Sequence, residues 1–475
     1  MFVMHIALQG CLKARDVPYG LTADTGGHIK YLLELVEAAS RAGVTRQELV
    51  VRRFHDDVLG HEYAEPFEGM DVEGGTARIV RIEGATPAYL PKERLGPELP
   101  ALTANLIEHI LSLPSWPDVV HAHYADAGHV AAEVKRRLGI PFVFTAHSLG
   151  RVKLGSMPQL DGCPRLAARI EAEERAMREA DALIVSSRDE AVAQYGLYAD
   201  GRRATPRIRI NPPGCDLDAF GSDAPRDDAL ERDVSRGLDR PDLPPVLALA
   251  RPVAKKNLAG LVRAFGASDL RERANLVVVA GTRTDLREEE REHRAVLEEL
   301  LYLADLHDLA GSFSMPKRHA PHQVPALYAY ARARRGVFVN VALNEPFGLT
   351  YLEAAASGVP VVATCHGGPR DIVGRLDNGA LVEPLDETAI ARAIAVLVDE
   401  PARWNEAASN GLARIGHYGW TRHARDYVRE LSLLAKGHAP HIRLPRSAAS
   451  ATASPSASTA PFGPHPLPSP SGLPS

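Results

Sequence analysis

Residues 336–365 read GVFVNVALNEPFGLTYLEAAASGVPVVATC. The apolar runs at its two ends are rich in valine and are bounded by glycine and proline, which predicts buried strands. The segment GLTYLEAAASG between them has a helical pattern of apolar residues and predicts a helix. A strand, a helix and a second strand in this order form a βαβ unit, so the stretch predicts an α/β fold with a parallel sheet.

The same alternation continues along most of the chain. In the first half, strands are predicted at 4–10, 49–54, 118–124, 141–147 and 182–187, and helices at 27–43, 129–139 and 169–180. In the second half, further strands are predicted at 245–250 and 275–281, and helices at 257–266 and 348–358, each ended by a glycine at C′. We expect two doubly wound, Rossmann-like domains facing across a cleft, because such sheets bind ligands outside the carboxyl ends of their strands.

The expected domain boundaries follow changes in composition. We expect a first domain over 1–217, a charged linker with one short helix over 218–243, and a second domain over 244–418. A last helix over 419–437 is expected to pack back on the first domain. Residues 440–475 are rich in serine, proline and alanine, so this tail is predicted to be disordered, because it cannot bury enough apolar surface.

Composition and charge argue against several classes of protein. The formal net charge is -5 with acidic and basic residues mixed, which disfavours a nucleic-acid-binding protein. The four cysteines form no CxxC pair, which disfavours a zinc site or disulfide framework and favours reduced thiols in the cytoplasm. The N-terminus does not have the pattern of a signal peptide, and no run of about 18 apolar residues predicts a membrane span.

Unusual polar residues gather where the predicted strands of the first half end. Gly26 and Gly27 let a ligand approach the backbone, although a simple strand-to-helix turn is an equal alternative. The run HAHYADAGH, residues 121–129, holds three histidines, but their spacing is not that of a known metal site and no metal is expected. Tyr124 and Asp126 are better candidates for hydroxyl and phosphate contacts. The run TAHSLGRVK, residues 145–153, is a further polar strand-exit loop.

Two motifs in the second half suit a ligand with phosphate groups and vicinal hydroxyls. In RPVAKKN, residues 251–257, Arg251 and Lys256 suit a diphosphate, and Asn257 is expected to cap the next helix; a solvated loop is the alternative. In NEPFGLTYLEAAASG, Glu345 precedes the helix and Glu353 lies inside it. A carboxylate can bind two vicinal hydroxyls, as in ribose, and the free amides at the start of the helix can bind a phosphate.

These motifs resemble those of a known enzyme family. EPFGLTYLEAAASGVPVVATCHGGP is similar to the Glu-x7-Glu donor motif of retaining GT-B glycosyltransferases, and the spacing of Arg251 and Lys256 matches their diphosphate pair. More narrowly, the chain resembles sucrose-phosphate synthases in the motifs ADTGGHIKYLLEL, YLPKERL, HAHYADAG, TAHSLGRVK, RIEAEERA and MPKRHAPHQVPALY. The likeness extends over residues 5–435 and implies a GT-B fold.

The resemblance also implies an activity. It implies transfer of glucose, with retention, from a nucleotide-diphosphate glucose such as UDP-glucose to fructose 6-phosphate, which gives sucrose 6-phosphate. It implies no cofactor and no Mg²⁺ requirement for the chemistry. A separate sucrose-phosphate phosphatase is then an expected partner, and neither a nucleic acid nor a membrane is.

The implied roles divide between the two domains, with the acceptor in the first and the nucleotide-sugar in the second. Catalytic roles are implied for His147, which faces the transferred sugar, and for Glu345, Arg251 and Lys256. Donor-binding roles are implied for Gly27, Arg251, Lys256, Glu345, Phe347, Gly348, Leu349 and Glu353. Acceptor-binding roles are implied for Gly27, His28, Lys92, Tyr124, Ser148, Lys153 and Arg169.

Departures from the family pattern leave alternatives open. The family usually has glutamine where this chain has His28, near the acceptor sugar, and aspartate where it has Val253 in the donor loop. Sister transferases with the same fold are alternatives, namely a mannosylfructose-phosphate synthase with GDP-mannose or a sucrose synthase with free fructose. The basic loop HSLGRVK favours a phosphorylated acceptor. A non-catalytic sugar-nucleotide sensor is the more distant alternative, because the chain keeps all five implied active-site residues: His147, Arg251, Lys256, Glu345 and Glu353.

Overall fold

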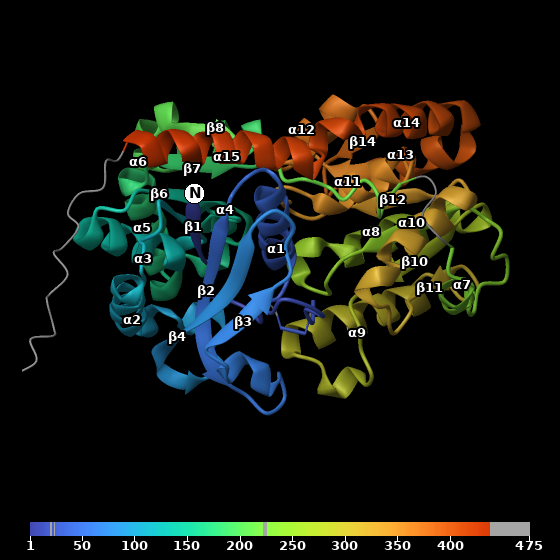
Figure 1. Cartoon of the computed structure of the whole chain (residues 1–475). Coiled ribbons are helices and arrows are strands. Elements are labelled where there is room, and N and C mark those ends of the chain that lie inside the picture. The colour runs from blue at the N-terminus through green and yellow to red at the C-terminus, as the bar shows by residue number, and fades with distance from the viewer. Residues whose placement is uncertain (20, 23, 222–225, 438–475) are drawn as a thin grey trace, which may run out of the picture. The chain divides into compact units, whose positions relative to one another are not determined.

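A computed structural model describes residues 1–19, 21–22, 24–221 and 226–437 (Figure 1). These residues belong to one compact unit, Met1–Ala439, which contains two sheets. The expected disordered tail over 440–475 lies outside the described residues.

The first sheet has eight strands in the order β3-β4-β2-β1-β5-β6-β7-β8. All neighbours are parallel except β3 and β4, which form an antiparallel pair at one edge. The strands are β1 (Phe2–Ile6), β2 (Arg46–His55), β3 (Phe67–Met70), β4 (Thr76–Ala88), β5 (Val119–His123), β6 (Phe142–Thr145), β7 (Ala182–Val185) and β8 (Ile208–Ile210). The direction of chain progression reverses between β1 and β5, and this switch point is where such sheets bind ligands.

Helices cover this sheet because β1, β5, β6 and β7 are buried on both faces. They are α1 (Gly27–Arg41), α2 (Leu99–Ser112), α3 (Ala125–Leu138), α4 (Gly150–Ser156), α5 (Pro164–Glu179) and α6 (Ala199–Arg203). The last helix, α15 (Trp420–Gly437, red in Figure 1), also belongs here, because Tyr427 and Leu431 pack into the cluster that contains Val3 and Leu35.

The second sheet has six parallel strands in the order β11-β10-β9-β12-β13-β14. They are β9 (Pro245–Leu249), β10 (Asn275–Val279), β11 (Phe313–Ser314), β12 (Val337–Asn340), β13 (Val361–Thr364) and β14 (Gly379–Val382). The helices are α7 (Asp228–Ser235), α8 (Leu258–Gly266), α9 (Arg291–Leu306), α10 (Val324–Ala333), α11 (Leu349–Ala356), α12 (Pro369–Leu376), α13 (Glu387–Asp399) and α14 (Pro401–Arg414). Its switch point lies between β9 and β12.

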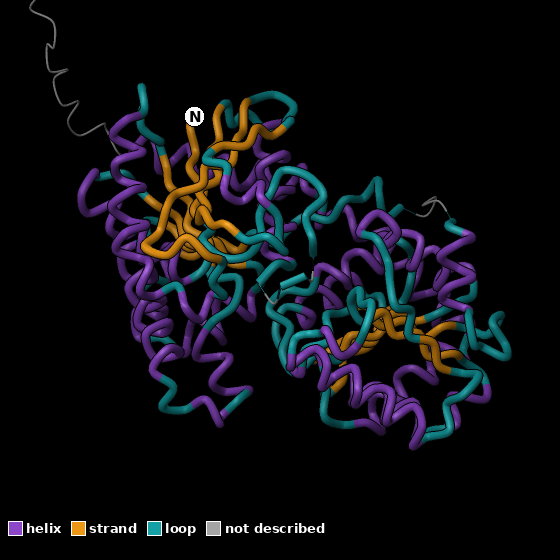
Figure 2. The backbone as a smooth tube through the Cα atoms, turned by 90° about the horizontal axis from the view of Figure 1, so that it is seen from below, coloured by secondary structure: helices purple, strands orange, loops and turns teal. Residues whose placement is uncertain are grey.

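The fold class predicted from the alternation of strands and helices is confirmed. Figure 2 shows each sheet as a layer of strands with helices around it. Every strand and helix predicted from the sequence is present within a few residues of its expected place, and α7 is a short helix inside the expected linker. The hairpin of β3 and β4 was not predicted from the sequence.

Two local predictions are wrong. Asn257 does not cap α8 with its side chain; it has a φ of 51° and its Nδ2 donates instead to the backbone carbonyls of Val341 and Pro384, at 3.1 and 2.7 Å. Gly266 is the last residue of α8 rather than its C′ residue, whereas Gly358 follows α11 with a φ of 67°, as predicted.

Among the described residues, we find no helix with the length and apolar content needed to cross a membrane.

Candidate active site

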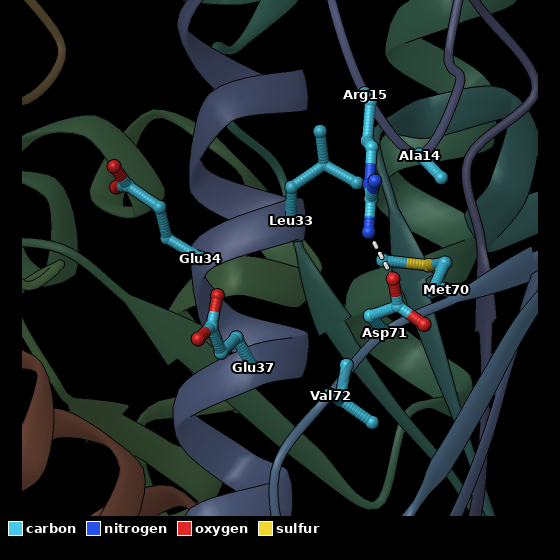
Figure 3. Close-up of a pocket in the computed structure, with 8 residues that line it drawn as sticks. All are labelled: Ala14, Arg15, Leu33, Glu34, Glu37, Met70, Asp71 and Val72. Carbon is cyan, nitrogen blue, oxygen red and sulfur yellow. Dashed lines mark hydrogen bonds and ion pairs between the residues drawn. The ribbon is translucent and has the colours of Figure 1, made fainter.

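A cleft of about 790 Å³ lies at the carboxyl ends of both sheets' strands, at the two switch points. Most residues with a predicted role line it: Gly27, His28, Lys92, Tyr124, His147, Ser148, Arg251, Lys256, Glu345, Phe347, Gly348, Leu349 and Glu353. Lys153 and Arg169 are not part of the lining. A smaller cavity of about 280 Å³ beside α1 and β3 contains none of the predicted residues (Figure 3).

A partly buried ion pair lies in the cleft where β12 ends. Nζ of Lys256 donates to the Glu345 carboxylate, which also accepts a hydrogen bond from Asn340 Nδ2 at 3.3 Å. Burial alone raises the pKa of Glu345, but the charges of Lys256 and Lys255 and these hydrogen bonds bring it below its ordinary value. Glu345 is therefore an ionised carboxylate that is already paired, and Lys256 is held in place by it.

Arg251 adds a further cation to this part of the cleft. It lies against Gly26, where an added Cβ atom would be 3.5 Å from Cζ of Arg251, so the glycine pair of the first domain and the basic loop of the second meet. Burial lowers the pKa of Arg251, with Asp24 and Glu345 opposing that effect. Because arginine starts from a very high pKa, it stays charged.

Lys255 is a cleft residue that our sequence reasoning missed. It is exposed to solvent within the cleft, yet desolvation by the surrounding protein, followed by repulsion from Lys256 and Arg251, lowers its pKa to about 8. Three cations close enough together for Lys256 and Arg251 to lower the pKa of Lys255 indicate a site for a polyanion. The doubled lysine in RPVAKKN was the available signal.

The start of α11 depends on Gly348. Its φ of 99° lies in the left-handed region, and an added Cβ atom would come 2.3 Å from the ring of Tyr351. Glycine at this position therefore leaves the first amides of α11 open to the cleft, and such amides favour an anion. Phe347 and Leu349 flank the turn and also line the cleft.

Glu353, the predicted ribose ligand, forms an ion pair with a helix of the first domain. Its Oε1 atom accepts from Nζ of Lys30 in α1 at 2.5 Å, and Oε2 accepts from Tyr328 Oη at 3.3 Å. Burial alone lowers the pKa of Lys30, but the charges of Glu353 and Glu34 raise this pKa above its ordinary value. Lys30 was not predicted as a site residue, although it lies in the motif ADTGGHIKYLLEL.

The acceptor side is built on residues that hold one another. Nζ of Lys92 donates to the carboxylate of Asp24, and the backbone N–H of Lys92 donates to the same carboxylate at 2.8 Å. His28 hydrogen-bonds to the backbone carbonyl of Gln9, which leaves its buried Nε2 atom without a partner among the described residues. Because burial lowers the pKa of His28 to about 4, this Nε2 atom is an unprotonated acceptor in a residue that lines the cleft.

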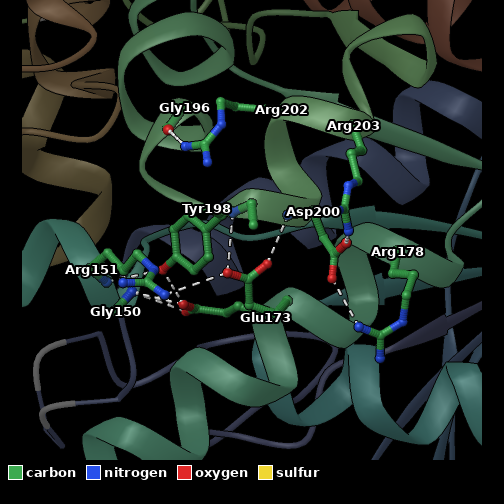
Figure 4. Close-up of polar contacts among 11 residues, drawn as sticks. Gly150, Arg151, Glu173, Arg178, Gly196, Tyr198, Asp200, Arg202 and Arg203 are labelled. Carbon is green, nitrogen blue, oxygen red and sulfur yellow. Dashed lines mark hydrogen bonds and ion pairs between the residues drawn. The ribbon is translucent and has the colours of Figure 1, made fainter.

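Arg169 stands behind the wall of the cleft. Its Nη2 atom donates to the carbonyl and hydroxyl oxygens of Ser148 at 2.7 and 3.0 Å, and its guanidinium lies 4.5 Å from the Tyr124 ring centroid. The fully buried Glu173 accepts from Arg169 Nε at 2.8 Å and from the backbone N–H of Gly150. Figure 4 shows Glu173 close to Gly150 and Tyr198. Arg169 thus orients two lining residues, and its acceptor-binding role stays a prediction.

Lys153 lies in α4, one turn beyond Gly150, and is partly exposed. Asp126, near Tyr124, is not in the lining, and desolvation raises its pKa to about 7. The direct phosphate contact expected from Lys153 therefore also stays a prediction.

A buried group of histidines adjoins the cleft. His5 in β1 and His121 in β5 are register partners, and His5, His121 and His123 could together hold a metal ion. His129, the third histidine of the motif, is not in this group, and His5 was missed because only the pairing of β1 with β5 brings it there. Every ring nitrogen of the three has a hydrogen-bond partner, so all are satisfied in their present arrangement.

Comparisons with known proteins agree with this architecture. The model of the glycosyl transferase 4-like domain matches residues 26–214, and that of glycosyl transferases group 1 matches residues 234–413. Sucrose-phosphate synthase 4 of Arabidopsis thaliana is 36% identical over 506 residues, which is 92% of this chain and 48% of that protein. The chain thus spans about half the length of the curated relatives it matches.

Solved structures show the fold. A sucrose-phosphate synthase from Thermosynechococcus elongatus superposes with a TM-score of 0.73 at 22% identity, covering 92% of this chain and 100% of that one. HepE of Anabaena in complex with UDP-glucose superposes with a TM-score of 0.63 at 16% identity, covering 91% of this chain and 100% of that one. At these identities the likeness establishes the GT-B fold.

Proposed function

Because this chain belongs to the GT-B glycosyltransferases and is homologous to the sucrose-phosphate synthases, we propose that it transfers glucose from a nucleotide-diphosphate glucose to fructose 6-phosphate. The product is sucrose 6-phosphate. The observation that carries the proposal is the cleft itself, which is lined both by three cations and by a loop with hydroxyl and imidazole groups.

The donor's diphosphate fits the cations Arg251, Lys255 and Lys256. Negative charge develops on the leaving diphosphate as the bond to the sugar breaks, and fixed positive charge lowers the energy of that state. Lys256 is held by Glu345 and Arg251 by its packing beside Gly26, so neither needs to reorganise. The amides at the start of α11 supply further donors for the phosphate oxygens.

Transfer with retention places the acceptor hydroxyl and the leaving phosphate on the same face of the glucosyl ring. Residues of both domains line the cleft, among them His147 and Ser148 from the first and Glu345 and Phe347 from the second. Holding both substrates together converts a bimolecular reaction into a reaction within a single complex, and it keeps water away from the donor. Glu345, being paired with Lys256, binds the donor rather than attacking it.

We propose that the chemistry needs no metal ion, because the three cations can carry the charge that Mg²⁺ carries in other nucleotide sites. Initial rates measured after exhaustive dialysis against EDTA should equal those in 5–10 mM MgCl₂, to within about twofold. A loss of more than about tenfold on chelation, restored by Mg²⁺, contradicts this proposal.

One matrix of reactions tests the proposed activity. The protein is incubated with UDP-, ADP- and GDP-glucose and GDP-mannose, each with fructose and with fructose 6-phosphate, and products are identified by mass spectrometry and NMR. We expect a phosphorylated disaccharide only where a glucosyl donor is combined with fructose 6-phosphate. Transfer of mannose, or transfer to free fructose, supports one of the sister activities, and no transfer from any donor supports the sensor.

A sucrose-phosphate phosphatase is the partner that this reaction calls for, because the product still carries a phosphate. The four cysteines are all free thiols, which supports a reducing compartment such as the cytoplasm. Fractionation of cells that produce the protein, with an antibody against it, tests the compartment.

A further inference from the structure

Two buried histidines and the partly buried His147 form a row that leads from the cleft into the core of the first sheet. His147 lines the cleft, and its Nε2 atom lies 3.0 Å from Nδ1 of His123. Nε2 of His123 lies 3.3 Å from Nδ1 of His5. The row ends at Gln47 in β2, whose Oε1 atom lies 3.1 Å from Nε2 of His5. Each contact joins two ring nitrogens or a nitrogen and an oxygen, so each contains one shared hydrogen.

The orientation of the Gln47 amide is fixed by its other contacts. Its Nε2 atom lies 2.7 Å from the backbone oxygen of Val36 and 2.8 Å from Oγ of Ser40. A backbone carbonyl can only accept, so the group that faces Val36 must be the NH₂ end of the amide. The carbonyl end of Gln47 therefore faces His5, and it too can only accept.

The three rings are neutral, so each carries a single N–H. Burial lowers the pKa of His5 to about 4 and that of His147 to about 3, and it lowers the pKa of His123 well below its ordinary value. A neutral imidazole that donates from one nitrogen must accept at the other. The direction of one hydrogen bond in the row therefore dictates the direction of the next.

The direction propagates outward from Gln47. His5 donates from Nε2 to Gln47, so its Nδ1 atom accepts from Nε2 of His123. Nδ1 of His123 then accepts from Nε2 of His147. The ring of His121 lies against that of His123, tilted by 39°, but it bonds elsewhere, to Tyr427 Oη and Thr145 Oγ1, both at 2.9 Å, so it does not compete for these hydrogens.

We infer that Gln47 acts through His5 and His123 to hold His147 as the Nε2–H tautomer, with the lone pair of Nδ1 presented to the cleft. Nδ1 of His147 has no hydrogen-bond partner among the described residues. A lone pair there accepts from a hydroxyl, and it rejects an acceptor group such as a phosphate oxygen. On the proposed function, on which this part rests, the hydroxyl belongs to the transferred sugar, and Gln47, His5 and His123 are positioning residues.

The backbone and a neighbouring ring hold His147 for this task. Its φ of 56° is a left-handed conformation that a residue with a side chain rarely adopts, and such strain gathers at functional sites. The ring of Tyr31 meets that of His147 edge to face, with centroids 5.3 Å apart. The imidazole cannot turn over without breaking its contact with His123, so the tautomer decides what the cleft is offered.

The tautomer can be read directly in the unliganded protein. Full-length protein labelled with ¹⁵N in its histidine rings is measured by cross-polarisation NMR, which separates protonated from unprotonated Nδ1, and the His147 signal is assigned by its loss in a His147→Asn variant. We expect His147 with protonated Nε2 and bare Nδ1. A protonated Nδ1 on His147 overturns the inference, as does a stoichiometric metal ion bound by His5, His121 and His123.

Variants at Gln47 test the origin of the tautomer. Gln47→Met removes the acceptor for His5, and a protonated Nδ1 signal from His147 should appear. Gln47→Glu keeps an oxygen toward His5 in either protonation state, and Ser40→Ala removes one partner of the amide while leaving Val36. Both should keep the wild-type signal. An unchanged His147 signal in Gln47→Met overturns the inference.

Kinetics provide a second readout for the same variants. Losing one hydrogen bond to a hydroxyl lowers kcat/KM for the donor by about tenfold in Gln47→Met, while Gln47→Glu and Ser40→Ala stay within about threefold. The ¹⁵N NMR spectrum reports the tautomer of His147 whether or not the protein has any activity. If the protein transfers no sugar but shows the expected tautomer, the proposed function is wrong and the inference about the tautomer is supported. If it transfers sugar but His147 has the other tautomer, the proposed function is supported and the inference about the tautomer is wrong.

Discussion

At the scale of single residues, the charged groups of the cleft are held by partners before any substrate arrives. Lys256 is paired with Glu345, Lys92 with Asp24, and Glu353 with Lys30. Such pairing fixes each side chain in one geometry, which reduces the entropy lost on binding. Near the start of α11, the charges of Lys256 and Arg251 repel Lys255 and contribute to its lowered pKa of about 8.

Lys256 is the residue whose loss should most affect turnover. Lys256→Ala removes a fixed charge from the leaving diphosphate and breaks the ion pair with the partly buried carboxylate of Glu345. We expect kcat to fall by about 10²- to 10³-fold, as for loss of one oxyanion donor. Lys317→Ala, at an exposed lysine outside the cleft lining, is the matched control and should keep wild-type kcat. Steady-state kinetics under saturating donor decide, and a fall of less than about threefold contradicts the role.

Glu173 should control the acceptor side without touching substrate. Glu173→Gln weakens the buried pair with Arg169, which orients Ser148 and Tyr124, so KM for the acceptor should rise while KM for the donor stays constant. Removing one charge of a buried pair should also lower the free energy of unfolding by about 2–3 kcal/mol. Glu171→Gln, exposed on the same helix, is the control for both measurements. Equal changes in both KM values contradict the assignment.

At the scale of elements, the site depends on how strands end and helices begin. Asn257 and Gly266 show why α8 was read wrongly in detail: the Asn257 side chain is used to join two loops, 84 and 127 residues away, rather than to cap its own helix. Cap rules consider only local partners, and here distant backbone carbonyls compete for the same amide. At position 348, by contrast, glycine is required by the local backbone itself, because its φ of 99° lies in the left-handed region.

Gly348, just before α11, and Gly374, inside α12, make a matched pair of glycines. Gly348→Ala forces a side chain into a left-handed backbone and against Tyr351, and it should lower the free energy of unfolding by about 1–3 kcal/mol and weaken nucleotide binding. Gly374→Ala, in α12, meets nothing within 4 Å and should raise stability by about 0.5–1 kcal/mol. Urea denaturation and calorimetry with the free nucleotide measure both effects. A neutral Gly348→Ala contradicts the argument.

At the scale of the whole molecule, buried neutral histidines link stability to pH. The pKa values of His5, His28 and His423 are lowered to about 4 and that of His147 to about 3, chiefly by burial. An unfolded chain binds these protons near pH 6.5. Between pH 6.5 and about 4 the unfolded state therefore holds more protons than the folded state, so stability falls as pH falls through this window.

The free energy of unfolding should therefore be lower at pH 5 than at pH 7.5, with each such histidine contributing at most about 1.4 kcal/mol per pH unit. Urea denaturation at a series of pH values gives the slope. His423→Gln should reduce that slope, whereas His61→Gln, at an exposed position, should leave it unchanged. A flat profile between pH 6.5 and 5 contradicts the linkage.

The sequence by itself determined the α/β class, the order of most strands and helices along the chain, and the motifs at strand ends that line the cleft. These features depend on local periodicity and on residues adjacent in the chain, which a linear pattern contains. It also pointed to NEPFGLTYLEAAASG and RPVAKKN, because carboxylates, cations and free helix amides beside a strand exit suit phosphate and hydroxyl groups.

Only the tertiary structure decided which side chains meet. His5 and His123 are 118 residues apart, and Lys30 and Glu353 are 323 residues apart, yet each pair is in contact. Strand order and the approach of the two sheets' switch points create these pairs, and no local pattern encodes either. For the same reason the sequence could name His147 as a cleft residue, but only the packed row ending at Gln47 indicates which of its nitrogens accepts.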